Sequence, residues 1–203
     1  MKRILLWLFA PLMAVFLTGC GYNEIQRLDE QVKAAWSQTL NQYERRAELV
    51  PKLVNSVNAY MAQERTVLTE VTDARSRVGS IQISVDDLDN PELMARFEQA
   101  QQQLSSALSR LLAVSENYPQ LKSDGLFRDL MTQLEGTENR IATERGRYVQ
   151  AVQAYNVYIR QFPTVITAKI FGYDVLPNYG VDRQSEIMRD PGVQFDVPAR
   201  SSG

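Results

Sequence analysis

The chain contains no histidine and a single cysteine, Cys20. Without histidine, neither a Ser-His-Asp or Cys-His catalytic arrangement nor a histidine metal site can form. With one cysteine, neither an intrachain disulfide nor a Cys-x-x-Cys redox pair can form. The glycines of the chain body, Gly79, Gly125, Gly136 and Gly146, are isolated, so a glycine-rich phosphate loop is absent. We therefore expect no cofactor.

Glycine and proline are also scarce, with 10 and 8 residues among 203, and most of them lie near the ends. Together with 44% hydrophobic and 23% charged residues, this composition favours one helical globular domain. The formal net charge of −2 becomes −4 without Lys2 and Arg3, with 20 basic against 24 acidic residues. Such a mildly acidic body has no basic patch for nucleic acid.

Residues 1–19 have the three parts of a secretory signal peptide. Lys2 and Arg3 are followed by an apolar run over residues 4–17 and by a Leu-Thr-Gly-Cys motif that ends at Cys20. The motif resembles the bacterial lipobox, which implies cleavage before Cys20 and acylation of its thiol and new amino group. An uncleaved transmembrane anchor is the alternative, but an apolar run of about 14 residues is short of the roughly 20 that spanning requires.

The predicted lipid at Cys20 also predicts where the protein resides. Three acyl chains hold a protein firmly, since one chain alone gives only marginal membrane binding. The residue after the cysteine is Gly21 and not aspartate. In a bacterium with two membranes, this resembles the signal for export to the outer membrane. We expect a lipid-anchored protein of the bacterial cell envelope, facing the periplasm in such a host.

Four amphipathic stretches follow, in which apolar residues recur at spacings of three and four. They cover residues 22–49, 51–79, 91–117 and 126–161, and their similar lengths favour an all-α, antiparallel up-down-up-down four-helix bundle. Pro51 indicates either a turn or a kink. The similar lengths agree with a turn, which we favour, whereas the unbroken phase of the stripe across Pro51 agrees with a kink.

The longest stretch carries a seam that includes two ions of opposite sign. A buried charge costs several kcal/mol unless it is paired, so Glu138 and Arg145 need partners on facing helices. Gly136, inside the same stretch, costs roughly 1 kcal/mol relative to alanine, which predicts close approach of a neighbouring helix. The seam consists of eight residues: Leu134, Glu138, Ile141, Arg145, Tyr148, Val152, Tyr155 and Ile159.

Residues 80–90 form an acidic loop that contains Asp86, Asp87 and Asp89. We interpret it as a solvated loop rather than a calcium site, because the glycine and terminal glutamate of an EF-hand are missing. Asn90, followed by proline and glutamate, has the residue types of a helix start.

The last part of the chain changes character. A short apolar piece over residues 165–171 predicts a fifth helix, which closes a bundle domain of residues 20–173. Residues 174–203 carry proline and glycine without periodicity and predict a disordered, flexible tail. Residues 193–197 alternate like a strand and offer an edge for a partner's sheet, although a plain flexible tail explains them more simply.

Three groups of residues resemble the LemA family of bacterial envelope proteins. They are residues 43–54 (YERRAELVPKLV), residues 134–142 (LEGTENRIA), and the short elements Tyr155-Asn156, Phe162-Pro163 and Phe171-Gly172-Tyr173. The resemblance covers residues 22–173 and implies a membrane-tethered helical bundle without an established enzymatic activity. The lipobox and the long tail depart from many members of the family.

Because Glu138 lies on the apolar seam, we hypothesise that Arg46 or Arg45 pairs with Glu138 or Glu135 across the bundle and fixes its register. An acid/base pair or a metal site is the alternative, but nearby arginines favour a structural ion-pair network. The predicted network has six members: Arg45, Arg46, Glu135, Glu138, Arg140 and Arg145.

These observations predict a non-catalytic lipoprotein that docks other envelope proteins or copies of itself. A binding protein for a lipid or a peptidoglycan fragment, held in a groove between helices, is the alternative. An enzyme that uses carboxylates alone is a third hypothesis, weakened by the missing catalytic residue types. The expected partners of the predicted lipoprotein are the membrane, through the N-terminal lipid, and other envelope proteins or copies of itself.

Overall fold

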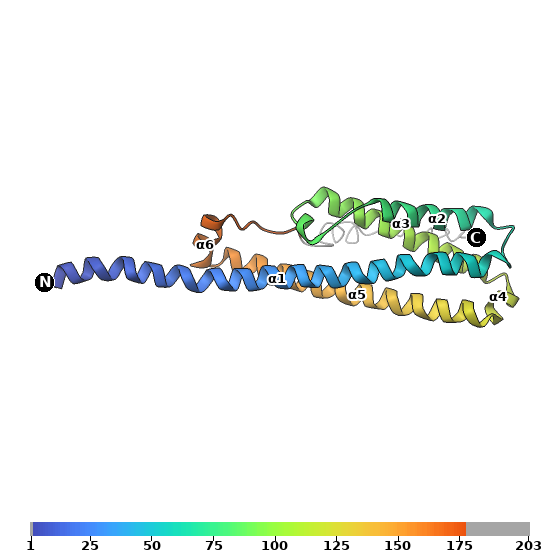
Figure 1. Ribbon diagram of the computed structural model, residues 1–203, viewed down its shortest axis with the longest axis horizontal. Helices are drawn as coiled ribbons and strands as arrows, with labels where there is room; N and C mark the ends of the chain where they lie inside the picture. The colour runs from blue at the N-terminus through green and yellow to red at the C-terminus, as the bar shows by residue number, and fades with distance from the viewer. Residues whose placement is uncertain (1, 178–203) are drawn as a thin grey trace, which may run out of the picture.

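The computed structural model describes residues 2–177, with side chains described from Gly21 onward. Within these residues the protein has helices and no strand, which confirms the all-α prediction. The two longest helices, α1 and α5, lie antiparallel along the molecule, and α2 and α3 pack as a hairpin beside them (Figure 1). The elements are α1 (Lys2–Asn58), α2 (Arg65–Ser80), a 3-10 helix η1 (Val85–Asp87), α3 (Pro91–Ser115), α4 (Pro119–Ser123), α5 (Gly125–Arg160) and α6 (Thr164–Phe171).

The turn that we predicted at Pro51 is wrong, because α1 continues to Asn58. Proline has no N–H, so the carbonyl of Ala47, four residues earlier, loses its helical partner. Nε of Arg75 on α2 donates a hydrogen bond to this carbonyl over 3.0 Å. Val50 and Leu53 are both buried beside the proline. The tertiary hydrogen bond and the unbroken apolar stripe therefore offset the cost of proline within the helix.

The expectation of four helices of similar length is also wrong. At a rise of about 1.5 Å per residue, the 36 residues of α5 extend about 54 Å, whereas the 16 residues of α2 extend about 24 Å. The hairpin of α2 and α3 consequently covers only the half of the α1–α5 pair that ends near α4 (Figure 1). At the opposite end α6 contacts both α1 and α5.

Two hydrophobic cores follow from this arrangement. The distal core, near α4, is almost entirely aliphatic, and the proximal core, near α6, is rich in aromatic residues. The distal core includes Leu49, Val50, Leu53, Val57, Met61, Val71, Leu104, Leu108, Leu111, Leu121, Phe127, Leu130 and Leu134. The proximal core includes Ile25, Val32, Trp36, Tyr43, Phe97, Ile141, Tyr148, Val152, Tyr155, Ile159 and Ala168.

The predicted seam of α5 is confirmed, since its six uncharged members are buried. The close approach predicted at Gly136 is wrong. This residue is exposed, and a Cβ placed there would meet no described atom within 4 Å.

Capping side chains define several element ends. The side-chain oxygen of Asn90 accepts from the N–H of Leu93 at 3.0 Å, at the predicted start of α3. Asp124 starts α5 by accepting from Phe127 at 2.9 Å. In the acidic loop, the Asp87 carboxylate accepts from the N–H and hydroxyl of Ser84, which lowers the pKa of Asp87. The loop therefore contains a capped 3-10 turn.

The segment after α6 is described as far as Pro177. The side-chain amide of Asn156 on α5 exchanges two hydrogen bonds with the backbone of Leu176, at 2.8 and 2.9 Å. The first residues of the predicted tail therefore lie against α5. The remainder of the tail, with the strand-like residues 193–197, lies outside the described residues.

Candidate functional site

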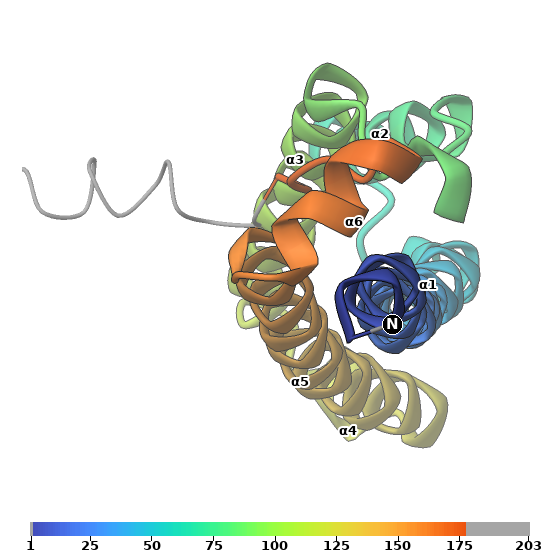
Figure 2. The same cartoon turned by 90° about the vertical axis from the view of Figure 1, so that its left-hand side faces the viewer.

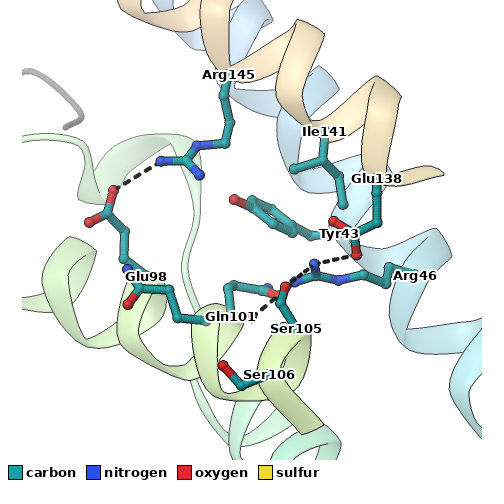
Figure 3. Close-up of a pocket in the computed structure, with 10 residues that line it drawn as sticks. Tyr43, Arg46, Glu98, Gln101, Ser105, Ser106, Glu138, Ile141 and Arg145 are labelled. Atoms are coloured by element: carbon teal, nitrogen blue, oxygen red, sulfur yellow. Dashed lines mark hydrogen bonds and ion pairs between the residues drawn. The ribbon is translucent and has the colours of Figure 1, made fainter. Parts of the chain in front are cut away.

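Arg46 on α1 is the centre of a polar layer, with only 2% of the residue exposed. Its Nη1 donates to Oε1 of Glu138 on α5 at 2.7 Å and to Oγ of Ser105 on α3 at 2.8 Å. Its Nη2 donates to the side-chain oxygen of Gln101 and to the Gln101 carbonyl at 3.3 Å. One guanidinium thus joins three helices. We call Arg46, Gln101, Ser105 and Glu138 the Arg46 layer (Figure 3).

The Arg46 layer lies where the two cores meet. On α1, Tyr43 belongs to the proximal core and Leu49 to the distal core, with Arg46 between them. On α5, Glu138 likewise separates Ile141 of the proximal core from Leu134 of the distal core. Because an unpaired buried charge costs several kcal/mol, only an alignment that brings the layer together is compatible with the fold. These contacts agree with the hypothesis that the ion pair fixes the register of the helices, which the stability of an Arg46 variant can test.

An open pocket of about 290 Å³ adjoins the layer between α1, α3 and α5. Arg145 on α5 lies 3.7 Å from the Glu98 carboxylate on α3, so this ion pair crosses the pocket at long range (Figure 3). The Arg46 guanidinium carbon lies 5.3 Å from the centroid of the Tyr43 ring, within the range of a cation–π contact. Burial raises the pKa of Tyr43, against the opposing effect of the two arginines.

Two hydrogen-bond donors of the layer, Nε of Arg46 and Nε2 of Gln101, are buried without a partner among the described atoms. A bound acceptor could use them, because leaving such groups unpaired costs free energy. The side chain of Glu138 is 41% exposed, so its carboxylate is also open to solvent. Within the described residues, no group of three acidic or sulfur side chains is placed to hold a metal ion.

The structure brings together only part of the predicted six-residue network. Arg46 pairs with Glu138, whereas Arg145 pairs with Glu98, which the sequence analysis did not single out. The remaining three predicted members are exposed and form no ion pair with any residue that the structure describes: Arg45, Glu135 and Arg140.

Gln101 and Ser105 were missed at the sequence level, although a signal for Gln101 exists. Phe97, Gln101, Leu104 and Leu108 follow one another at spacings of four, three and four. A polar residue at a stripe position of α3 indicates a buried polar contact, as Glu138 does on α5. Ser105 lies beside the stripe, so only the packed structure identifies it.

A second groove runs between α3 and α5 on the distal side of the layer. Its volume is about 420 Å³, and Glu138 lines both this groove and the pocket beside Arg46. Apolar side chains form much of the groove, with polar residues at its rim. The apolar side chains are Leu108, Leu112, Met131 and Leu134, and the polar ones are Ser105, Ser109, Glu135, Glu138 and Asn139.

The predicted lipidation site, Cys20, lies on α1, and its side chain is outside the described ones. The following residue, Gly21, faces α6: a Cβ there would lie 3.6 Å from side-chain atoms of both Thr164 and Thr167. In the described part of the chain, no helix combines the length and apolar character needed to cross a membrane.

The fold and the site define an elongated all-α protein in which a pair of long helices shares a buried arginine layer with a shorter hairpin. A family model for the LemA family matches residues 35–195. The chain belongs to the LemA family.

Relatives from three organisms are similar to this chain. Magnetosome protein MamQ 2 of Paramagnetospirillum magneticum is 27% identical over 171 residues, which cover 75% of this chain and 62% of the relative. Magnetosome protein MamQ of Magnetospirillum gryphiswaldense is 25% identical over 174 residues, with the same coverage. Protein LemA of Metamycoplasma hominis is 26% identical over 167 residues, covering 82% of this chain and 71% of the relative. The chain thus spans about three fifths of the length of the magnetosome relatives.

Proposed function

We propose that this protein is a lipid-anchored scaffold of the bacterial cell envelope that docks other proteins, or copies of itself, without catalysing a reaction. In this proposal the acyl chains at Cys20 hold the chain at the membrane, facing the periplasm if the host has two membranes. The four longest helices then act as an up-down-up-down bundle that presents a binding surface away from the bilayer. Membership of the LemA family supports the association with the envelope.

The groove between α3 and α5 is the observation that carries the docking proposal. Its apolar floor includes Met131, a flexible side chain that adapts to different partners. An apolar floor with a polar rim suits the apolar face of an amphipathic helix, which places side chains at every third or fourth position. Glu135 and Glu138 at the rim favour a partner helix with basic residues beside its apolar face.

Site-specific photocrosslinking in intact cells tests this proposal. A photoreactive amino acid in place of Met131 should form a defined adduct with an envelope protein or with a second copy of the chain. The matched control replaces Thr69, which is exposed on α2 outside the groove. Leu112→Glu, which puts a charge on the groove floor, should abolish the adduct. Recovery of only uncrosslinked monomer from the Met131 variant would contradict the proposal.

The anchor and the absence of catalysis have separate tests. The Cys20→Ser protein should leave the membrane fraction, and its full retention there would refute lipid anchoring. Glu135→Gln and Glu138→Gln variants should fold and still complement a deletion of the gene. Loss of complementation by a folded Glu135→Gln variant that still forms the Met131 adduct would favour an enzyme, because docking at the groove would then be intact.

Binding of a small anionic ligand is the second candidate function. Arg46 and Arg145 both line the pocket beside the layer, and two donors there are unpaired. A carboxylate of a peptidoglycan fragment or a lipid phosphate would suit them. However, Glu138 and Glu98 already neutralise both arginines, and about 290 Å³ is at the lower limit for ligand pockets. A thermal shift with muramyl peptides or phosphatidylglycerol that Arg145→Gln removes would establish this function instead.

A further inference from the structure

Helix α6 has an inverted amphipathic pattern. Its small residues Thr164, Thr167 and Ala168 are buried against the rest of the protein. Its large apolar residues point outward, although a surface helix normally buries them. We call four exposed side chains in and just before this helix the α6 patch: Phe162 (82% exposed), Ile166 (50%), Ile170 (65%) and Phe171 (56%).

The members of the α6 patch are close together in the chain, and two of them share one face of the helix. Ile166 and Ile170 lie four residues apart on successive turns of α6, whereas Phe162 lies in the turn that precedes the helix. Phe171 completes the patch and contacts the Tyr22 ring, with the two ring centroids 4.8 Å apart. Grouped exposed aromatic and β-branched residues on one short helix indicate an interaction site, whereas single exposed apolar residues do not.

The position of α6 favours the bilayer as the surface that covers the patch. Gly21 packs against α6, so the predicted acylation site, Cys20, is one residue from this contact. Figure 2 looks along α1 from its N-terminal end and shows α6 lying crosswise at the near end of the folded helices. A lipid anchor at Cys20 and a membrane-spanning start of α1 would both bring the bilayer to this same end. Attachment at this end therefore places α6, which carries the patch, close to the bilayer.

We propose that the α6 patch inserts into the interfacial region of the bilayer and sets the orientation of the bundle on the membrane. This inference rests on the proposed N-terminal attachment, which confines the patch to the bilayer surface. Short helices with a large apolar face and basic residues beside it lie in this region of membranes. Exposed Lys169 and Arg160 can contact lipid phosphates, while exposed Asp174 is the opposing charge nearby.

Insertion of the patch complements the acyl chains. The lipid at Cys20 prevents dissociation but leaves the bundle free to pivot about one residue. Contacts of Phe162, Ile166 and Ile170 with the lipid add further points of attachment on α6. The α3–α5 groove, on the distal side of the Arg46 layer, would then be held at a defined height above the bilayer.

Spin labelling of the full lipidated chain tests the inference. A nitroxide is attached to an Ile166→Cys variant, in which acylation of Cys20 leaves the new thiol as the one that reacts. The matched control is Leu126→Cys, at a 61% exposed position at the far end of α5. Both proteins are reconstituted into vesicles of phosphatidylethanolamine and phosphatidylglycerol. Collisions with oxygen, which concentrates in the acyl region, are compared with collisions with a water-soluble nickel chelate.

We expect the label at position 166 to collide mainly with oxygen and the label at position 126 mainly with the nickel chelate. Equal access of the chelate to both labels, on protein that stays with the vesicles in alkaline carbonate, would overturn the inference while leaving the anchor intact. Shielding of the 166 label from both reagents would also overturn it, because a protein would then cover the patch. Release of the protein into the carbonate wash would instead refute the proposed anchor.

Discussion

The distal and proximal cores share two helices but are built from different side chains. The distal core is covered by α1, α2, α3 and α5, and its fully buried members are aliphatic, such as Leu104 and Leu111. The proximal core has aromatic residues at its centre, where Trp36 lies 5.1 Å from Tyr148 and 6.0 Å from Phe97 between ring centroids. The number of covering helices explains this difference.

Beyond the start of α3, the described elements that cover the α1–α5 pair are α6 and short connecting segments. Fewer helices contribute fewer side chains, so each must fill more volume and bury more area, and aromatic side chains bury the most. Between the two cores the Arg46 layer is polar and open on one side, through Glu138. The molecule thus combines a conventional helical core, a polar spacer, and an aromatic core at the end that carries the predicted acylation site.

Truncation of the proximal core should have the largest effect. Trp36→Ala removes a fully buried indole, and we expect a loss of about 4 kcal/mol in the free energy of unfolding. Leu104→Ala in the distal core should cost about 3 kcal/mol. Because α1 and α5 run through both cores, urea unfolding followed by near-UV and far-UV circular dichroism should coincide for each variant. Two separate transitions would show that the cores unfold independently.

Loss of the Arg46 layer should have the next largest effect. Removing one member of a buried ion pair typically costs about 3 to 5 kcal/mol, but the exposed Glu138 carboxylate can regain water. We therefore expect Arg46→Met to lower the free energy of unfolding by about 2 kcal/mol. Arg45→Met, at the exposed neighbouring position, is the control and should change stability by less than about 0.5 kcal/mol. Equal effects in urea denaturation would contradict the structural role of the layer.

The hydrogen bond from Arg75 to the Ala47 carbonyl should be worth less, about 1 kcal/mol. Arg75→Met removes the donor, leaves this carbonyl without a described partner, and should reduce stability by that amount. In a Pro51→Ala background a backbone N–H is available at position 51, so the same change should cost little. A double-mutant cycle measures this coupling. If Arg75→Met were equally costly in both backgrounds, Arg75 would not compensate for the proline.

The stripes of the sequence predicted the helices well wherever apolar periodicity and a capping residue coincide. The start of α3 follows from Asn90, and the buried face of α5 follows from its seam. Pro51 shows the limit of local propensity. A stripe that keeps its phase indicated a continuous helix, but the compensating Arg75 is distant in sequence, and no local pattern identifies it.

The candidate site was only partly predictable for a similar reason. Glu138 could be singled out because a charge at a stripe position must find a partner, whereas Arg46 was one of two arginines named as that partner. Glu135 and Arg140 lie near Glu138 in the sequence and are also charged, so residue type alone does not separate them from the members of the Arg46 layer. In the structure both are exposed. Partner choice depends on the relative rotation of the three helices, and heptad spacing does not specify this rotation. The outward-facing α6 patch likewise requires the packed structure.

The smallest expected effect is a loss of stability at high pH, which originates in the proximal core. Burial raises the pKa of Tyr155 to about 12 and also raises that of Tyr148, and both belong to the proximal core. The folded protein then holds these protons more tightly than the unfolded chain, in which tyrosine has a pKa near 10.0. Stability is therefore complete below about pH 10 and falls as pH rises towards 12.

Tyr155→Phe removes one of these ionisations without changing the packing much. It should move the alkaline unfolding midpoint to higher pH while leaving urea stability at pH 7 nearly unchanged. Tyr158→Phe, at a partly exposed position of the same helix, is the control and should not move the midpoint. Near-UV circular dichroism during the pH titration measures the proximal core, where the aromatic residues gather. If Tyr155→Phe leaves the midpoint unchanged, ionisation of buried tyrosine is not what opens the aromatic core.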